Sequence, residues 1–408
     1  MASVVSMMKI LSSARDTLEL VVDQSGATLR GGDGADYGAT ELEYRLSAEE
    51  WKGGAPEGRY SLDLRPLDLG MGSKEWSISM ALSSPEESPP DPMPAHWEPS
   101  PATYAATIVD AEGIEMIVTA TAQPGVCVPL VIEEMDHVEL IDDPLAFVDQ
   151  LEWVTRAMAH DAGRENLASV AFARDGSLIA TDGHRLHKDS AGPLSPQRDD
   201  PFMLPMVAVQ RLLAVVKSYK KACPPLVVGW GKEPVRFPES DPKRQPNDAV
   251  RIVVGDWTIT ATARDGHFPP WEKVVPDYTG EDHVEISFDQ GAAALKKVTA
   301  ALTKSSKLAM GGGAELVIEG DKLSIRADHP DMGSASVVIP GAVISRHGLD
   351  SDLSVRVNPA YLIDAGMGEM SMAVAPPKPS SYDNAKPYPQ PILLTSGRRL
   401  AVVMPMGL

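Results

Sequence analysis

The chain of 408 residues has very little cysteine and no long apolar run. Its two cysteines, Cys127 and Cys223, are too few for a disulfide framework or a cysteine-based metal site, so we expect a reducing compartment. No apolar run approaches the roughly 20 residues that a membrane-spanning helix needs. Met1–Ala14 lacks a basic start and is interrupted by Lys9, so we expect an initial helix there and not a signal peptide. These features predict a cytoplasmic protein.

Positive charge is also scarce, because the formal net charge is −20. This excess of acidic residues argues against a nucleic-acid coat protein. The basic residues are nevertheless clustered on two predicted helices, one with Arg211, Lys217, Lys220 and Lys221 and one with Lys296, Lys297, Lys304 and Lys307. By themselves these clusters are best explained as solvated helix faces.

A repeated tetrapeptide shows the organisation of the chain. Asp-His-Val-Glu occurs at Asp136–Glu139 and again at Asp282–Glu285, an offset of 146 residues. Asp182 and Asp328, each near the end of a predicted strand, keep the same offset, and Asp33 lies 149 residues before Asp182. Repetition at a fixed period indicates an array of similar units. The sequence therefore predicts one unit used three times, with the first repeat the most diverged.

Each repeat has the same predicted order of elements: a helix, a hairpin, a second helix and further alternating strands. The first helices are predicted at Val4–Ser13, Pro144–His160 and Gln290–Thr303. The hairpins follow at Thr17–Gly31, Ala168–Thr181 and Ala314–Ala327. The second helices are predicted at Ser47–Trp51, Val207–Ala222 and Asn358–Ala365. Two proline-rich stretches, Ser83–Pro101 and Ala375–Pro391, are predicted to be solvated loops.

Two Asp-Gly-His motifs, at Asp182–His184 and Asp265–His267, raise the question of catalysis. With His187 nearby, one hypothesis is a metal-dependent hydrolase built around Asp182, His184, His187 and His267. The simpler interpretation is a strand end with an Asp-Gly turn, in which the aspartate bonds its own backbone. The threefold repetition favours the turn, because it explains both motifs without chemistry.

Three segments together resemble a known family. They are Ala180–Leu186 (Ala-Thr-Asp-Gly-His-Arg-Leu), the Phe-Pro segment Phe268–Pro276, and the terminal Val402–Leu408. In order and spacing they are similar to the β sliding clamp of bacterial DNA polymerase III, over about Val138 to Leu408. This chain departs from the family pattern at Gly407 and at Lys273, where arginine is common in the family. A guanidinium fork and an ammonium are not equivalent in binding.

The resemblance implies an α+β fold with three tandem clamp domains, each with two helices packed on antiparallel sheet. The repeats give domains at 1–136, with a proline-rich insertion at 83–101, then 137–281 and 282–408. Two chains would close head to tail into a homodimeric ring with helices lining its hole. The basic helix residues would then face DNA: Arg156, Arg164, Arg211, Lys217, Lys220, Lys221, Lys296, Lys297 and Lys304. Scattered Lys and Arg supply the sequence-blind phosphate contact that sliding requires.

The implied function is that of a processivity factor with no active site, no cofactor and no metal. It would encircle double-stranded DNA and tether the polymerase catalytic subunit, the clamp loader and other proteins with short clamp-binding peptides. The alternative is a clamp-derived binding or regulatory module that no longer encircles DNA, which the diverged first repeat favours. By resemblance, the peptide site would comprise Leu167, Thr181, Gly183, His184, Arg185, Leu186, Pro269, Lys273, Val274, Tyr361, Pro391, Val402, Met404, Pro405 and Met406.

Overall fold

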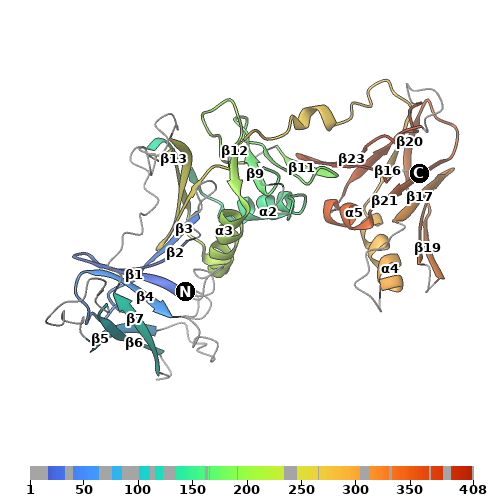
Figure 1. Ribbon diagram of the computed structural model, residues 1–408. Helices are drawn as coiled ribbons and strands as arrows, with labels where there is room; N and C mark the ends of the chain where they lie inside the picture. The colour runs from blue at the N-terminus through green and yellow to red at the C-terminus, as the bar shows by residue number, and fades with distance from the viewer. Residues whose placement is uncertain are drawn as a thin grey trace, which may run out of the picture. The chain divides into compact units, whose positions relative to one another are not determined.

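The computed structural model of the protein divides into two compact units (Figure 1). It describes residues 17–32, 40–63, 76–84, 101–110, 115–122, 135–160, 164, 166–190, 192–233, 246–264, 266–303, 313–329, 333–366, 369–379 and 387–406. The first unit comprises Met1–Val148 and Leu204–Asp265, and the second comprises Asp149–Met203 and Gly266–Leu408.

The first unit is built on one antiparallel sheet of eleven described strands, in the order β5-β6-β7-β4-β1-β2-β3-β15-β14-β13-β8. The strands of the first repeat are β1 (Thr17–Asp23), β2 (Gly26–Gly32), β3 (Thr40–Arg45), β4 (Gly58–Asp63), β5 (Trp76–Ser84), β6 (Thr103–Asp110) and β7 (Glu115–Ala122). Those of the second repeat are β8 (Met135–Ile141), β13 (Leu226–Glu233), β14 (Asn247–Val254) and β15 (Trp257–Thr262). The pairing of β3 with β15 makes the sheet continuous across the first two repeats.

Alternation of apolar and polar residues explains why this sheet has one buried face. In β1 and β2, Leu18, Leu20, Leu29 and their neighbours on the same face are buried, with Leu20 and Leu29 fully so. Helix α3 (Met206–Ser218) lies against β3 and β15 and continues into the short 3-10 helix η2 (Lys220–Ala222). The core of this unit therefore lies between the sheet and an apolar helix stripe.

The second unit contains a sheet of nine described strands, in the order β12-β9-β10-β11-β24-β23-β22-β16-β20. Its first four strands come from the second repeat: β9 (Ser169–Phe172), β10 (Leu178–Thr181), β11 (Arg185–Asp189) and β12 (Phe202–Pro205). The others come from the third repeat: β16 (His283–Ser287), β20 (Val343–His347), β22 (Ser371–Val374), β23 (Ile392–Ser396) and β24 (Arg399–Val403). The two repeats join where β11 pairs with β24.

A separate four-stranded sheet completes the second unit, in the order β19-β18-β17-β21. Its strands are β17 (Ala314–Glu319), β18 (Lys322–His329), β19 (Gly333–Ile339) and β21 (Leu353–Val357). Helix α4 (Gly291–Thr303) packs against β18, β19 and α5 (Pro359–Ala365). Asn358 caps α5 by accepting a hydrogen bond from the Ala360 amide, with proline at the first helical position.

The predicted hairpins are all present. β1 pairs with β2, β9 with β10, and β17 with β18, each antiparallel. These pairs confirm the repeated hairpin in all three repeats. The predicted helix at Val4–Ser13 lies outside the described residues, as does most of the proline-rich stretch 83–101. No helix in the described ranges combines the length and the apolar composition needed to cross a membrane.

Two predicted helices differ from the structure. Ser47–Trp51 is a turn and not a helix. Ser47 and Glu50 exchange bonds between side chain and backbone, at 2.8 and 3.3 Å, as at a helix start. Trp51 then forms a bridge with Ile78, so the chain extends along the sheet edge and the turn does not propagate.

The helix predicted at Pro144–His160 is α2 (Pro144–Thr155), which ends five residues earlier. Its final turn tightens, because the amides of Ala157 and Met158 donate to carbonyls three residues back. Leu145, predicted on the apolar stripe, is 41% exposed. The predicted domain boundary after residue 136 falls inside β8, and the boundary after residue 281 falls just before β16. Division into three domains at these boundaries stays a prediction.

Candidate functional site

The most specific motif forms a rigid turn between β10 and β11. One carboxylate oxygen of Asp182 accepts the backbone amides of His184 and Arg185, at 2.9 and 3.0 Å. The Thr181 hydroxyl accepts the Gly183 amide at 3.1 Å and donates to the Arg185 carbonyl at 2.6 Å. Gly183 has φ +88°, a conformation that favours glycine. The simpler interpretation of Asp182, a strand-end turn that bonds its own backbone, is therefore confirmed.

Strand β24 and Met404 lie directly beside this turn. β24 pairs with β11 so that Val402 faces Leu186 and Val403 faces Arg185. Beyond the strand, the Met404 amide donates to the His184 carbonyl at 2.9 Å. Two segments that are more than 200 residues apart in the sequence are thus joined by backbone hydrogen bonds. The motif of the second repeat and the terminal motif of the third form one continuous hydrogen-bonded element.

Arg185 ties this element to helix α5. Its Nε lies 3.0 Å from a carboxylate oxygen of Asp182, and one terminal nitrogen lies 2.6 Å from a carboxylate oxygen of Asp364. The guanidinium carbon also lies 4.4 Å from the centre of the Tyr361 ring, which is a cation–π distance. The Arg185 side chain is only 9% exposed. We conclude that Arg185 positions the turn and α5 relative to one another.

An apolar cluster lies on the sheet around these strands. Ala171, Ile179, Leu186 and Val402 are buried together. Six partly buried residues pack against them: Ala173, Phe268, Trp271, Val275, Leu393 and Leu400. Met404, at the end of the same strand, is 39% exposed. An accessible methionine, a soft and adaptable apolar side chain, therefore follows two residues after Val402 of the cluster.

The Phe-Pro segment adds further residues to the apolar cluster. Phe268, Trp271 and Val275 pack against the cluster, while Lys273 and Val274 face solvent, with Val274 46% exposed. The reason is the 3-10 helix η3 (Trp271–Val274), in which Trp271 faces the cluster and the next three side chains are exposed. The spacing of Phe268, Trp271 and Val275 at i, i+3 and i+7 was the sequence signal for the inward residues.

The remaining predicted residues have varied positions. Pro269, Leu167, Pro405 and Met406 are half-buried. The carbonyl of Pro391 accepts a hydrogen bond from the Tyr278 hydroxyl, whose pKa burial raises to about 12. The Met406 amide donates to the Arg356 carbonyl at 2.8 Å. Gly407 lies outside the described residues.

His187 is a core residue. It is fully buried, stacks on Trp153 at 4.6 Å, and its Nδ1 lies 2.9 Å from the Trp153 carbonyl oxygen. Burial lowers its pKa from 6.5 to about 4, so the ring is neutral and Nδ1 carries the proton. In the described part of the chain, the one group of three residues able to hold a metal is His283, Glu285 and His347. Asp182, His184, His187 and His267 do not form such a group in the described part of the chain, so the hypothesis of a hydrolase centre built from them is not supported.

The lysines predicted to face DNA are exposed on two helical segments. Lys217, Lys220 and Lys221 lie at the end of α3 and in η2, and Lys296 and Lys297 lie on α4 opposite buried Leu295 and Val298. Arg156 donates to the Asp364 carbonyl at 3.4 Å, and exposed Arg164 donates to the Asp182 carbonyl at 2.9 Å. Lys304 and Lys307 lie outside the described residues.

Arg211 does not fit the prediction. It is 3% exposed, and its guanidinium donates to the backbone carbonyls of Gly31 and Thr40, at 3.3 and 3.0 Å. These carbonyls belong to β2 and β3 of the first repeat. The side chain follows the buried stripe of α3 with Ala208 and Val215. Its charge is satisfied inside the first unit, so Arg211 serves the fold and is not a surface contact.

Comparison with known proteins agrees with this arrangement. No family model matches the chain. Over 321 residues the beta sliding clamp of Salmonella typhimurium is 24% identical and that of Escherichia coli 23%, with 74% of this chain and 78% of each relative covered. Among solved structures, the DNA polymerase III beta subunit of Thermotoga maritima gives a TM-score of 0.67 at 17% identity, covering 99% of this chain and 96% of that one. That of Pseudomonas aeruginosa gives 0.65 at 19% identity, covering 98% and 93%.

The fold defined by the two shared sheets and the three repeated hairpins is that of a DNA sliding clamp. Sequence similarity to curated relatives extends along three quarters of the chain, and the three segments that carry the resemblance meet in one place. In sequence the chain is similar to beta sliding clamps at 23–24% identity, and in fold it is similar to the beta subunit of bacterial DNA polymerase III.

Proposed function

We propose that two copies of this chain close into a ring around double-stranded DNA and act as a processivity factor in the cytoplasm. The relatives named above are beta sliding clamps or polymerase III beta subunits, which supports this function. A protein that encircles DNA converts dissociation of a tethered polymerase into a local event, so rebinding occurs at high effective concentration. This function needs topology and a docking site but no catalytic residue, cofactor or metal.

We further propose that exposed Met404, beside the apolar cluster around buried Leu186 and Val402, is part of a surface that binds short peptides of the polymerase catalytic subunit, the clamp loader and other partners. The observation that carries this proposal is the hydrogen bond between the Met404 amide and the His184 carbonyl, because it joins two motifs from different repeats. A second support is the Bartonella birtlesii sliding clamp, which has been solved bound to griselimycin. We expect griselimycin to bind this chain at the surface that includes Met404.

The DNA-binding proposal rests on the exposed lysines of α3, η2 and α4. Their contact with phosphate would be sequence-independent, while the acidic remainder of the surface would repel DNA. Charge reversal at Lys296 and Lys297 should shorten retention on circular DNA several-fold at low salt. The matched control reverses Lys322 and Lys378, which lie outside the proposed helices and change the net charge equally.

The assay loads each variant onto nicked circular DNA and follows release by gel filtration. The expected order is wild type and control together, with the α4 variant released faster. Equal retention of all three proteins would remove α4 from the DNA-facing surface. If none is retained even after loading, the alternative of a clamp-derived module that does not encircle DNA is favoured. Sedimentation supplies the second readout, because a monomer at micromolar concentration cannot close the proposed ring.

A further inference from the structure

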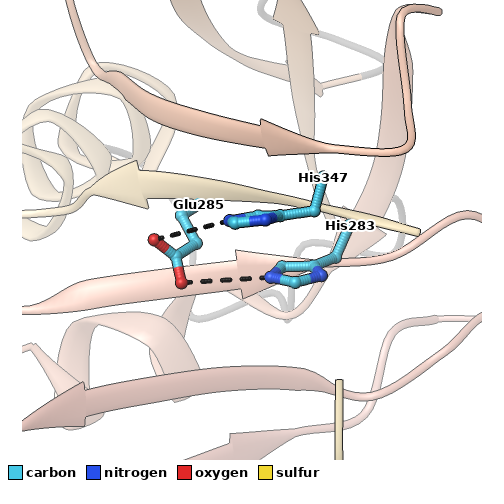
Figure 2. Close-up of side chains that lie close together, drawn as sticks. All are labelled: His283, Glu285 and His347. Carbon is cyan, nitrogen blue, oxygen red and sulfur yellow. Dashed lines mark ion pairs between the residues drawn. The ribbon is translucent and has the colours of Figure 1, made fainter. Parts of the chain in front are cut away.

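A cluster of two histidines and a glutamate lies at the edge of the nine-stranded sheet, on β16 and β20 (Figure 2). β20 is the last described strand on this side. In the antiparallel register His283 lies directly opposite His347, and Glu285 lies opposite Ser345. Because side chains two residues apart share a face of a strand, His283 and Glu285 project together with His347.

The three side chains converge on a small space. Glu285 lies with one carboxylate oxygen 3.9 Å from Nε2 of His283 and the other 4.0 Å from Nε2 of His347. One ligand atom from each residue can be chosen so that all three lie within 4.8 Å of one another. The two imidazole rings are stacked, with centres 4.3 Å apart. Figure 2 shows the carboxylate of Glu285 facing both rings.

The tautomer of His283 is set by the backbone. Its Nδ1 lies 2.8 Å from the Glu281 carbonyl oxygen, which requires the proton on Nδ1. In the neutral ring, Nε2 then presents a lone pair toward the carboxylate of Glu285. Two electron-rich atoms face each other without a donor between them, and a cation at that position would bind both. A carbonyl partner on the other ring nitrogen is the usual support of a metal-bound histidine.

The distances suit a transition metal after modest movement. Tetrahedral Zn²⁺ with bonds of about 2.0–2.2 Å holds its ligand atoms roughly 3.3–3.5 Å apart, slightly closer than the 3.9 and 4.0 Å observed. The side chain of His283 is 10% exposed, and those of Glu285 and His347 are 40% and 49% exposed. Because the rings are stacked, the ligand atoms of both histidines can meet at one ion only if a ring rotates. The exposed side chains of His347 and Glu285 can rotate toward the ion, while buried His283 stays in place.

The second repeat offers an internal comparison. Its own Asp-His-Val-Glu places His137 and Glu139 on β8, the strand that corresponds to β16. Glu139 there accepts a hydrogen bond from Trp230 Nε1 at 2.7 Å, and β8 is the last described strand of its sheet. No second histidine joins this pair among the residues that the structure describes. The tetrapeptide of the second repeat thus supplies two potential ligands, His137 and Glu139. That of the third repeat supplies His283 and Glu285, which His347 joins as a third.

We propose that His283, Glu285 and His347 bind one divalent transition-metal ion, with Zn²⁺ as the preferred ion, and that this ion fastens edge strand β20 to β16. Two imidazoles and one carboxylate are a ligand set suited to Zn²⁺ and leave a fourth position for water. Without metal, the Ser345 hydroxyl holds the group together, at 3.0 Å from the Glu285 carboxylate and 2.9 Å from His347 Nε2. Metal binding would displace that hydroxyl from His347.

The test titrates ZnCl₂ into chelator-treated full-length protein by isothermal calorimetry, and Co²⁺ absorption reports the coordination geometry. We expect one strong site per chain, with at least tenfold weaker binding in His347→Ala and in Glu285→Gln. His137→Asn, in the corresponding motif of the second repeat, should bind as the wild type does. Zn²⁺ should raise the melting temperature of the wild type and of His137→Asn, but not that of His347→Ala.

Glu285→Gln keeps the side-chain shape, so a loss of Zn²⁺ affinity with an unchanged metal-free melting temperature supports ligation and excludes misfolding. Wild-type affinity in both cluster variants would overturn the proposal and leave Ser345 as the centre of a hydrogen-bond network. A stoichiometry below one ion per chain would overturn it as well. Neither result depends on DNA or peptide binding, so failure of this proposal is distinct from failure of the clamp function.

Discussion

Met404 provides the sharpest test of the proposed peptide site. Its backbone is fixed by the bond to His184, yet the residue is 39% exposed, so its side chain is available to a ligand. Replacement by alanine leaves the backbone bond intact and removes only apolar surface. Because the position follows the last strand, we expect the fold and the oligomeric state of Met404→Ala to match the wild type.

The magnitude follows from the exposed area. An exposed fraction of 39% of a methionine surface of roughly 200 Å² leaves about 80 Å² for a ligand to cover. At about 25 cal/mol per Å², full burial contributes about 2 kcal/mol, which corresponds to a roughly 30-fold loss of affinity on truncation. A value near this size requires that the ligand cover the methionine almost completely.

The assay is calorimetric titration of griselimycin, with sedimentation to check the oligomer. Val138→Ala is the matched control, since Val138 is a 53% exposed apolar residue on β8 and is not one of the proposed site residues. We expect a roughly 30-fold weaker Kd for Met404→Ala and an unchanged Kd for Val138→Ala. Equal affinity in all three proteins would show that Met404 does not contact the ligand and would refute the area argument.

Two further substitutions test the framework of the site. Asp364→Asn removes the charge that faces Arg185 at 2.6 Å. Because the Asp364 side chain is 38% exposed, we expect the free energy of unfolding to fall by only about 1 kcal/mol, seen as a melting temperature roughly 2–4 °C lower. Glu319→Gln, at an exposed position, is the control. An unchanged melting temperature would mean that the pair contributes nothing measurable. Burial lowers the pKa of His187 from 6.5 to about 4 in the folded protein. Its contribution to the free energy of unfolding is therefore complete above pH 6.5 and is lost as the pH falls toward 4. Between pH 7 and 4.5 the loss is about 2–3 kcal/mol. Urea unfolding of His187→Gln should show a smaller loss over that interval, and a parallel loss would exclude His187 as the cause.

The hairpins could be predicted from the sequence because their signals are local. Turn residues such as Asp175 and Gly176 lie between short apolar strands, and the same pattern recurs in each repeat. The Asn358 cap was equally local. The turn at Ser47–Trp51 has the same starting signal as a helix, but its continuation depends on the bridge to Ile78, which no local pattern contains. Long-range pairing therefore decided the structure there.

The helical period of α3 indicates a buried position for Arg211, although its charge favours an exposed one. Arg211 follows Ala208 by three residues and precedes Val215 by four, which places it on the buried stripe of α3. The charge alone suggested an exposed position, while the periodicity indicated an inner one. The bonds to Gly31 and Thr40 satisfy the guanidinium, which is the condition under which an arginine is buried.

The cluster on β16 and β20 was beyond prediction for a different reason. His283 and Glu285 were visible as part of a repeated tetrapeptide, and their spacing alone predicts a shared strand face. The third ligand, His347, comes from a strand more than 50 residues later, and its register against β16 is set by pairing. One residue of slip would turn His347 to the opposite face. Sequence spacing therefore predicts that His283 and Glu285 lie together, but not that His347 joins them.

The end of the chain shows how the two kinds of contact combine at the proposed peptide site. The Met404 amide donates to the carbonyl of His184, in the turn between β10 and β11, and the Met406 amide donates to that of Arg356, in β21 of the four-stranded sheet. Met406 also packs over Gly313, where an added Cβ would lie only 2.5 Å from its sulfur. Since positions on both sides of Pro405 are anchored, Met404 is presented from a fixed backbone, and a ligand covering it pays little ordering entropy beyond the side chain itself.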